Sequence, residues 1–370
     1  MAQAQARLRQ TAPRPAAAPA YATVVKTARR LHGALVTDDT GAERIDLHGD
    51  DGAVLLGWND PQVEIAVAAA PSVGAVEAEA AERLADALPC AEAVGFRTSL
   101  QLALADALVV AKTVTGRDGA FFCDDAIAAA GDVESIGEAL DTHAGEVAAL
   151  VVRPLDAPRE FLLAAKRLAR RDGVVLVFDE SRTALRVHAG GAQALHGVVP
   201  DLAVIGASLA NGRPLGAVAG AIDLMKTLPA SGPRPSAASL AAACATLDTV
   251  ERADVPAALR VRGAEIAAEV EARLHAAGAG SFLEIVGDPT WSCLNVRARV
   301  GRDGKAVLEA LTRRLYDQGV LSLGAHVPSL ALGEAEIAGL LAAYDAVLPE
   351  LAAQVLNGRF DKPVRRRTVA

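Results

Sequence analysis

One acidic residue, Asp179, stands where an open α/β sheet would place a chemically useful carboxylate. It directly follows Val174–Phe178, an unbroken apolar run with the length of a buried strand. Open α/β sheets bind ligands beyond the carboxyl ends of their strands, so a carboxylate there could act as an acid or a base. A structural role is the alternative: the carboxylate could cap a helix or pair with Arg182 or Arg186, since a buried charge needs a partner. We favour the structural role.

The thiol of Cys123, which precedes Asp124 and Asp125, is a second candidate for chemistry, as a nucleophile. A small buried cysteine that only fills space is the commoner case, and we favour it. No CxxC pair occurs among the four cysteines, so neither a disulfide framework nor a structural zinc site is expected (Cys90, Cys123, Cys244, Cys293).

Histidines and glycines give weaker signals. His188, His196 and His326 show no paired spacing, so no metal site is expected. Neither a GxGxxG nor a GxxxxGK[ST] phosphate loop occurs. The turn-rich stretch 209–214 could still line a concave site.

The elements that position Asp179 form a strand–helix–strand pattern. The apolar runs Val147–Val152 and Val174–Phe178 flank a predicted helix, Pro158–Arg171, that is closed by a glycine, and another strand is predicted at Leu202–Ile205. This order is typical of a parallel sheet covered by helices on both faces. We therefore predict an α/β fold with a mostly parallel sheet.

Around this sheet the chain divides into predicted segments. Residues 1–20 are rich in proline and small residues and are expected to form a flexible arm. A small domain is expected to take its first part from residues 21–70 and its second from 256–355, with the large α/β domain at 71–255. Residues 356–370 contain three consecutive arginines, at 365–367, and are expected to be a disordered basic tail.

Composition excludes several classes of protein. The 370 residues carry a net charge of −8 and are 52% hydrophobic, which suits a folded protein without general affinity for nucleic acid or anionic membranes. No apolar run approaches the ~20 residues of a membrane span, and no hydrophobic signal segment is visible at the start. We expect a cytoplasmic protein.

The segment around Asp179 resembles the central motif of class III aminotransferases, of the glutamate-1-semialdehyde aminomutase and ornithine aminotransferase type, which have PLP fold type I. The likeness extends over roughly residues 21–352 and rests on several stretches (Gly57–Pro61, Thr115–Arg117, Phe178–Arg186, Pro200–Leu202, Asn211–Gly216, Leu240–Asp248, Gly319–His326, Glu334–Leu351). The resemblance implies PLP chemistry, a smaller domain built from both chain ends and a homodimer.

The resemblance also shows what this chain lacks. The family's Schiff-base lysine follows a glycine after the next strand, and here Ala207 follows Gly206. A methyl group can neither form the Schiff base nor move a proton to or from the cofactor. Lys166 lies on the preceding crossover helix and Lys226 is nineteen residues further on.

The family's other cofactor contacts are altered as well. Its Ser-Gly-Thr phosphate turn corresponds to Ser99-Leu100-Gln101, and its ring-stacking Tyr-His-Gly corresponds to Ile127-Ala128-Ala129. Ser181 replaces the apolar residue that packs under the ring. Asp179, which pairs with the pyridine nitrogen in the family, is retained. If any cofactor binds, Asp179, Ser181, Ser99 and Gln101 are the residues expected to contact it.

Three hypotheses for the function follow. The first is a lysine-less, PLP-independent pseudoenzyme that acts as a partner or scaffold subunit, as a homodimer or with an active paralogue, and uses no cofactor. The second is a repurposed enzyme whose emptied pocket holds another small molecule, with Asp179 or a neighbour as acid or base. The third retains aminotransferase or aminomutase chemistry with PLP or PMP held non-covalently.

Overall fold

The computed structural model describes residues 24–123, 125–297 and 304–357. They divide into two compact units: the large unit contains Gly52–Ala258, and the small unit contains residues 24–51 and the described residues from Leu259 onward. The predicted arm at 1–20 and the tail beyond residue 357 lie outside the described residues. The predicted domain boundaries stay predictions.

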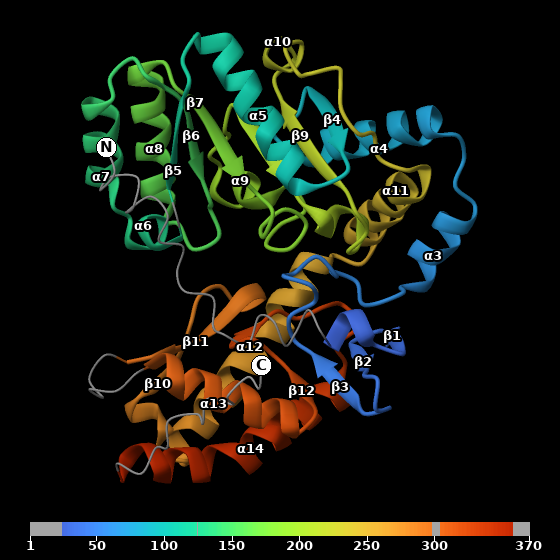
Figure 1. Cartoon of the computed structure of the whole chain (residues 1–370), viewed down its shortest axis with the longest axis vertical. Helices are drawn as coiled ribbons and strands as arrows, with labels where there is room; N and C mark the ends of the chain where they lie inside the picture. Colours follow the sequence, from blue (N-terminus) through green and yellow to red (C-terminus); the bar gives the residue numbers. More distant parts are fainter. Residues whose placement is uncertain (1–23, 124, 298–303, 358–370) are drawn as a thin grey trace, which may run out of the picture. The chain divides into compact units, whose positions relative to one another are not determined.

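The large unit is built on a six-stranded sheet with the order β4-β9-β8-β7-β6-β5 (Figure 1). Strands β5 to β8 run parallel to one another, and β9 is antiparallel to both β8 and β4. The prediction of a mostly parallel sheet is therefore confirmed. The strands are β4 (Ala93–Arg97), β5 (Gly119–Cys123), β6 (Val147–Val152), β7 (Val175–Asp179), β8 (Leu202–Ile205) and β9 (Gly216–Gly220).

Helices cover both faces of this sheet, and the side chains of each strand alternate between the two faces. On β6, Leu150 and Val152 pack with residues of helices α6 (Asp125–Ala130), α7 (Val133–Thr142) and α8 (Arg159–Asp172). Ala149 and Val151 point to the other face and pack with helix α5 (Leu100–Thr115). This two-sided burial explains the unbroken apolar strands of the sequence.

Helices of the large unit begin and end at recognisable signals. Helix α8 follows Pro158, has two arginines in its last turn and is closed by Gly173, whose φ of 61° suits glycine. The helices are α3 (Pro61–Ala68), α4 (Val73–Ala87), α5 (Leu100–Thr115), α6 (Asp125–Ala130), α7 (Val133–Thr142), α8 (Arg159–Asp172), α9 (Gly191–His196), α10 (Ile222–Met225) and α11 (Ala237–Arg252). Helix α12 (Val255–Ala276) begins in the large unit and continues into the small one.

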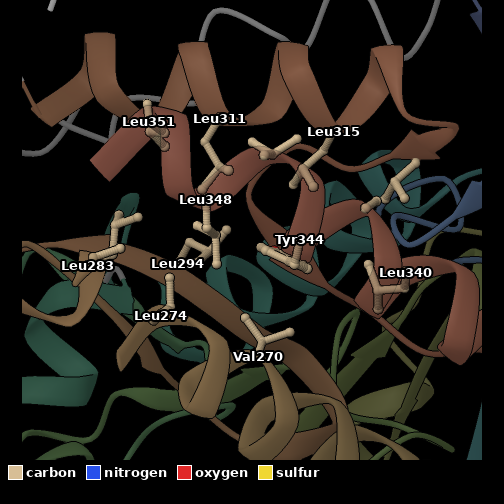
Figure 2. Packing of buried hydrophobic residues seen from close by; sticks show 14 of the residues in the cluster. Val270, Leu274, Leu283, Leu294, Leu311, Leu315, Leu340, Tyr344, Leu348 and Leu351 are labelled. Atoms are coloured by element: carbon tan, nitrogen blue, oxygen red, sulfur yellow. The ribbon is translucent and has the colours of Figure 1, made fainter. Parts of the chain in front are cut away.

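The small unit contains two small sheets, α13 (Gly304–Asp317) and α14 (Glu334–Leu356). One sheet has the order β1-β2-β3-β12 and the other β10-β11-β13. Figure 2 shows its core, in which Leu340, Tyr344 and Leu348 of α14 pack with residues of α12 and α13. The strands are β1 (Arg30–His32), β2 (Leu35–Thr37), β3 (Glu43–Asp46), β10 (Leu283–Val286), β11 (Ser292–Val296), β12 (Val320–Leu321) and β13 (Ala325–His326).

Helix α14 alone among the described helices is long and apolar enough to cross a membrane by length and composition. Its apolar side chains have another use in this structure, because Leu340, Leu348 and Leu351 are buried in the core of the small unit. A core helix of a compact domain passes the same test of length and composition.

A polar group is buried within this apolar core. The ring of His326 is fully buried, with Nε2 2.7 Å from the Tyr344 hydroxyl and Nδ1 3.3 Å from the Ser292 hydroxyl. Burial lowers the pKa of His326 to about 4 and raises the pKa of Tyr344. Both groups are therefore neutral at physiological pH, and they satisfy each other within the core.

We expect the small unit to lose stability as the pH falls from about 6.5 to about 4. In this pH window the histidine of the unfolded chain is protonated, whereas His326 of the folded chain stays neutral. Protonation therefore stabilises the unfolded state, and the full difference in pKa lowers the free energy of unfolding by roughly 3 kcal/mol. Urea unfolding at a series of pH values, compared with His326→Gln, measures the effect. Equal pH dependence in the two proteins would show that His326 does not titrate in this way.

Candidate functional site at the carboxyl edge of the sheet

Several strand ends meet at one edge of the large sheet. Strands β5 to β8 end there, and β9 begins there because it runs antiparallel to β8. Strand β4 ends beside the start of β9, since Arg97 is paired with Gly216. This edge therefore gathers Asp179, the segment after Ile205 and the start of helix α5. It is the edge where open α/β sheets bind ligands.

Asp179 is paired with Arg153, which follows the neighbouring strand. Nε of Arg153 lies 3.1 Å from Oδ2 of Asp179. The register explains the pairing: Val152 is opposite Phe178 in the parallel β6–β7 pair, so the next residues are neighbours. The carboxylate side chain is 4% exposed and the arginine side chain is 41% exposed. The structural role favoured for Asp179 thus has a partner, which the sequence analysis sought at Arg182 and Arg186 instead.

The other carboxylate oxygen of Asp179 is also bonded. Oδ1 accepts a hydrogen bond of 3.1 Å from the backbone N–H of Ser181. Ser181 lies close to Gly206: a Cβ added to this glycine would be 3.3 Å from the Ser181 Cβ. Asp179 is therefore held from both oxygens, and the serine at 181 lies against the segment that follows β8.

Glu180 has a structural function that the sequence analysis did not assign. Its carboxylate is fully buried and accepts hydrogen bonds from the backbone N–H groups of Ala192, at 2.8 Å, and Gln193, at 3.1 Å. It also accepts from the Thr183 hydroxyl. Burial raises the pKa of Glu180, while these donors oppose the rise. Glu180 thus fixes the start of α9.

Ala207 begins a short 3₁₀ turn, Ala207–Ala210, directly after β8 and Gly206. The next residue, Ser208, is buried, and its hydroxyl has no hydrogen-bond partner among the residues that the structure describes. A buried hydroxyl without a partner is costly, so it marks a place where a water or a ligand would be stabilised. The sequence analysis did not single out Ser208.

Ser99 and Gln101 lie at the start of α5, at this same edge. The Ser99 hydroxyl accepts a hydrogen bond of 3.2 Å from Leu102 N and so caps its own helix. The Leu100 side chain packs against the apolar core beneath α5, and Gln101 is exposed. Strand β9 also lies close, because a Cβ on Gly216 would be 2.4 Å from the Ser99 carbonyl oxygen.

Positions 127–129 belong to α6, and Ile127 and Ala128 pack into the core on the other face of the sheet. They carry no aromatic ring at the edge. The described lysines of the large unit lie elsewhere: Lys112 is in the last turn of α5, Lys166 is within α8, and Lys226 follows α10 and is paired with Asp223. Helix α5 starts at the carboxyl edge and β9 ends at the opposite one, so Lys112 and Lys226 lie near the far edge.

The stretch 209–214, which we expected to be able to line a concave site, is tied to the segment before α3. Asn211 accepts a hydrogen bond from Leu56 N and donates one to the Gly57 carbonyl, both of 2.9 Å. Arg213 pairs with Glu64 on α3 at 2.8 Å. These two side chains therefore hold the loop in place.

The remaining candidates have structural surroundings. Cys123 is 2% exposed and belongs to the core between the sheet and α8. Nδ1 of His188 accepts a hydrogen bond from Gly190 N within its own turn. Within the described parts of the chain, no group of three or more His, Cys, Asp or Glu residues is placed to hold a metal ion.

We expect Cys293, which is partly exposed, to be the first of the four cysteines to react with a thiol reagent in the folded protein. Burial raises the pKa of Cys90 to about 12 and that of Cys244 to about 11, so little reactive thiolate forms there. Labelling with a chromogenic disulfide, followed by peptide mapping, gives the order, and Cys293→Ser should remove the fast phase. Fast labelling of Cys123 would restore it as a candidate nucleophile.

Comparison with known proteins agrees with this architecture. The Aminotransferase class-III family matches residues 124–337. Glutamate-1-semialdehyde 2,1-aminomutase of Symbiobacterium thermophilum is 33% identical over 57% of this chain and 60% of its own length. The protein of the same name from Roseiflexus castenholzii is 31% identical over 68% of this chain and 73% of its own. The chain thus spans about three fifths of the length of the first of these relatives.

Solved structures give the same fold. A transaminase with PLP bound is 26% identical and superimposes with a TM-score of 0.76, covering 89% of this chain and 92% of the other. The PLP internal aldimine form of the Sphingopyxis sp. MTA144 FumI protein is 21% identical, with a TM-score of 0.81, covering 96% and 97%. The prediction of PLP fold type I is confirmed.

Proposed function

Because this chain belongs to the class III aminotransferase family, we propose that it is a member that does not transaminate and that works without PLP, as a partner or scaffold subunit. One observation carries the proposal: the residue after Gly206, at the end of β8, is Ala207. The family's chemistry depends on a lysine there, since PLP chemistry starts and ends on that amine. In this proposal the protein keeps the fold of the family but does not carry out the family's defining reaction.

The other residues of the edge also fit PLP poorly. The phosphate of PLP needs close approach to backbone N–H groups, yet Leu100 stands where the family has glycine, and β9 lies against the Ser99 carbonyl. Its ring needs an aromatic partner, and Ile127 and Ala128 offer none. Its pyridine nitrogen needs the Asp179 carboxylate, which Arg153 already engages. Hence we derive no reaction step through the cofactor.

The proposed role is that of an assembly partner. By its family, the chain is expected to form a homodimer, or a mixed dimer with an active paralogue. A mixed dimer would leave the chemistry to the paralogue and give this chain a structural share in the assembly. Co-expression of the two chains, followed by size-exclusion chromatography with mass detection, would distinguish the two forms.

A second candidate function is a repurposed site for another small molecule. The buried Ser208 hydroxyl favours it, because this group has no partner among the described residues and lies in the turn after Ala207. A ligand with a hydrogen-bond acceptor would satisfy it. Asp179 is a weaker candidate for acid–base work in this role, since both of its oxygens are bonded.

The experiment that tests the first proposal is reductive trapping. The purified chain is incubated with PLP and reduced with borohydride, and its mass is measured by mass spectrometry. An active class III transaminase is treated in parallel. We expect stoichiometric addition of one pyridoxyl group to the active enzyme and only scattered, substoichiometric addition to this chain. Stoichiometric addition at one lysine, mapped by peptide analysis, would contradict the proposal.

A further inference from the structure

We propose that Arg153 is a built-in counter-ion that takes the place of the cofactor's pyridinium at Asp179. The inference rests on the proposed function, in which no PLP occupies this edge. Without the cation that a cofactor would supply, the fold needs another positive charge to stabilise the buried carboxylate. Arg153 is thus a residue that holds the site in its cofactor-free form.

The register of strands β6 and β7 places Arg153 beside Asp179. Val152 is opposite Phe178, so the next pair is Arg153, which directly follows β6, and Asp179, which is the last residue of β7. Their positions also continue the alternation of Val151 and Val177, which pack on the α5 face of the sheet. Strand register alone therefore brings the guanidinium to the carboxylate, and no long loop has to be ordered for the contact.

The Asp179 carboxylate is buried, so it needs a cation nearby. The Asp179 side chain is 4% exposed, and a buried carboxylate without a cation is unstable. Arginine keeps its charge at any physiological pH and is weakly hydrated, so it suits a half-buried ion pair. With Nε of Arg153 on Oδ2 and the Ser181 N–H on Oδ1, both oxygens are compensated within the chain.

Arg153 would compete with a cofactor for the same carboxylate oxygen. A pyridinium nitrogen that approached Oδ2 of Asp179 would meet the Arg153 guanidinium at 3.1 Å from the same oxygen. Two cations on one carboxylate oxygen repel each other, so the ring could enter only if Arg153 left. The pair therefore both stabilises the buried carboxylate and disfavours the cofactor.

A double-mutant cycle on thermal unfolding tests the inference. We expect Arg153→Ala to lower the Tm of the large unit by about 3–6 °C. In an Asp179→Asn background, where no charge needs compensation, the same change should lower it by less than about 1 °C. Arg153→Lys, which keeps the charge, should retain most of the Tm. Equal losses in both backgrounds would overturn the inference.

Chemical rescue adds a readout that a packing defect would not give. Millimolar methylguanidinium should raise the Tm of Arg153→Ala, and it should leave Arg153→Ala/Asp179→Asn unchanged. Arg171→Ala is the matched control, because that side chain is similarly exposed and pairs with Asp141 on the protein surface; it should show no rescue. Absence of rescue in Arg153→Ala would count against the counter-ion role.

These results are separable from the proposed function. If the wild-type chain bound PLP stoichiometrically, the proposed function would fail whatever the cycle showed. If the wild-type chain bound none and the cycle showed no coupling, only the role of Arg153 would fail.

Discussion

Replacing Ala207 with lysine is expected to leave the chain without measurable transaminase activity. The substitution restores the amine at the end of β8 but none of the contacts that would hold PLP against it. Loss of one preorganised electrostatic contact typically costs about 10²–10³ in rate. In the proposed function the phosphate turn, the stacking ring and the free carboxylate are all altered, so we expect turnover at least about a thousandfold below that of an active relative.

The measurement is an amino-transfer assay of Ala207→Lys with PLP added in excess, together with the absorbance spectrum of the protein after gel filtration. We expect no protein-bound internal-aldimine band. A class III transaminase prepared in the same way serves as the positive control. An aldimine band and turnover in the single variant would show that the phosphate and ring sites survive, and the fit argued from Leu100 and Arg153 would be wrong.

Replacing Glu180 with alanine is expected to lower the free energy of unfolding by about 3–5 kcal/mol. The change removes the acceptor of the Ala192 and Gln193 N–H groups and of the Thr183 hydroxyl, all inside the protein. Each buried donor left without a partner costs about 1–3 kcal/mol, partly relieved where water enters. The start of α9 should loosen first.

Urea unfolding followed by circular dichroism measures this loss. Glu180→Gln keeps one acceptor and the side-chain volume, so we expect it to lose less, about 1–2 kcal/mol. Glu138→Ala, an exposed glutamate on α7, is the control and should change stability by less than about 0.5 kcal/mol. A loss below about 1 kcal/mol for Glu180→Ala would contradict the structural function of this carboxylate.

The fold could be predicted from the sequence because its signals are local. Apolar runs of strand length around a capped helix predict a parallel sheet, and β6, α8 and β7 form as expected. The position of Asp179 at a strand end also followed from the sequence. Its surroundings did not, because they depend on which strands are neighbours and in what register.

Arg153 illustrates the difference. The sequence analysis sought a partner for Asp179 nearby in the chain, at Arg182 and Arg186, whereas the partner that the structure gives is 26 residues away. A signal was present: Arg153 follows one apolar run as Asp179 follows the next. Ser208 gave no such signal, since only the packed structure shows that its hydroxyl is buried and has no partner within the described part of the chain.

The most direct test of the central claim is a calorimetric titration of the wild-type chain with PMP. PMP has no aldehyde, so it cannot form an imine with surface lysines, and a saturable heat reports non-covalent binding at a defined site. We expect no saturable binding up to millimolar PMP, with an active class III transaminase binding under the same conditions. Saturable, stoichiometric binding would contradict it and would place non-covalent PLP or PMP chemistry first.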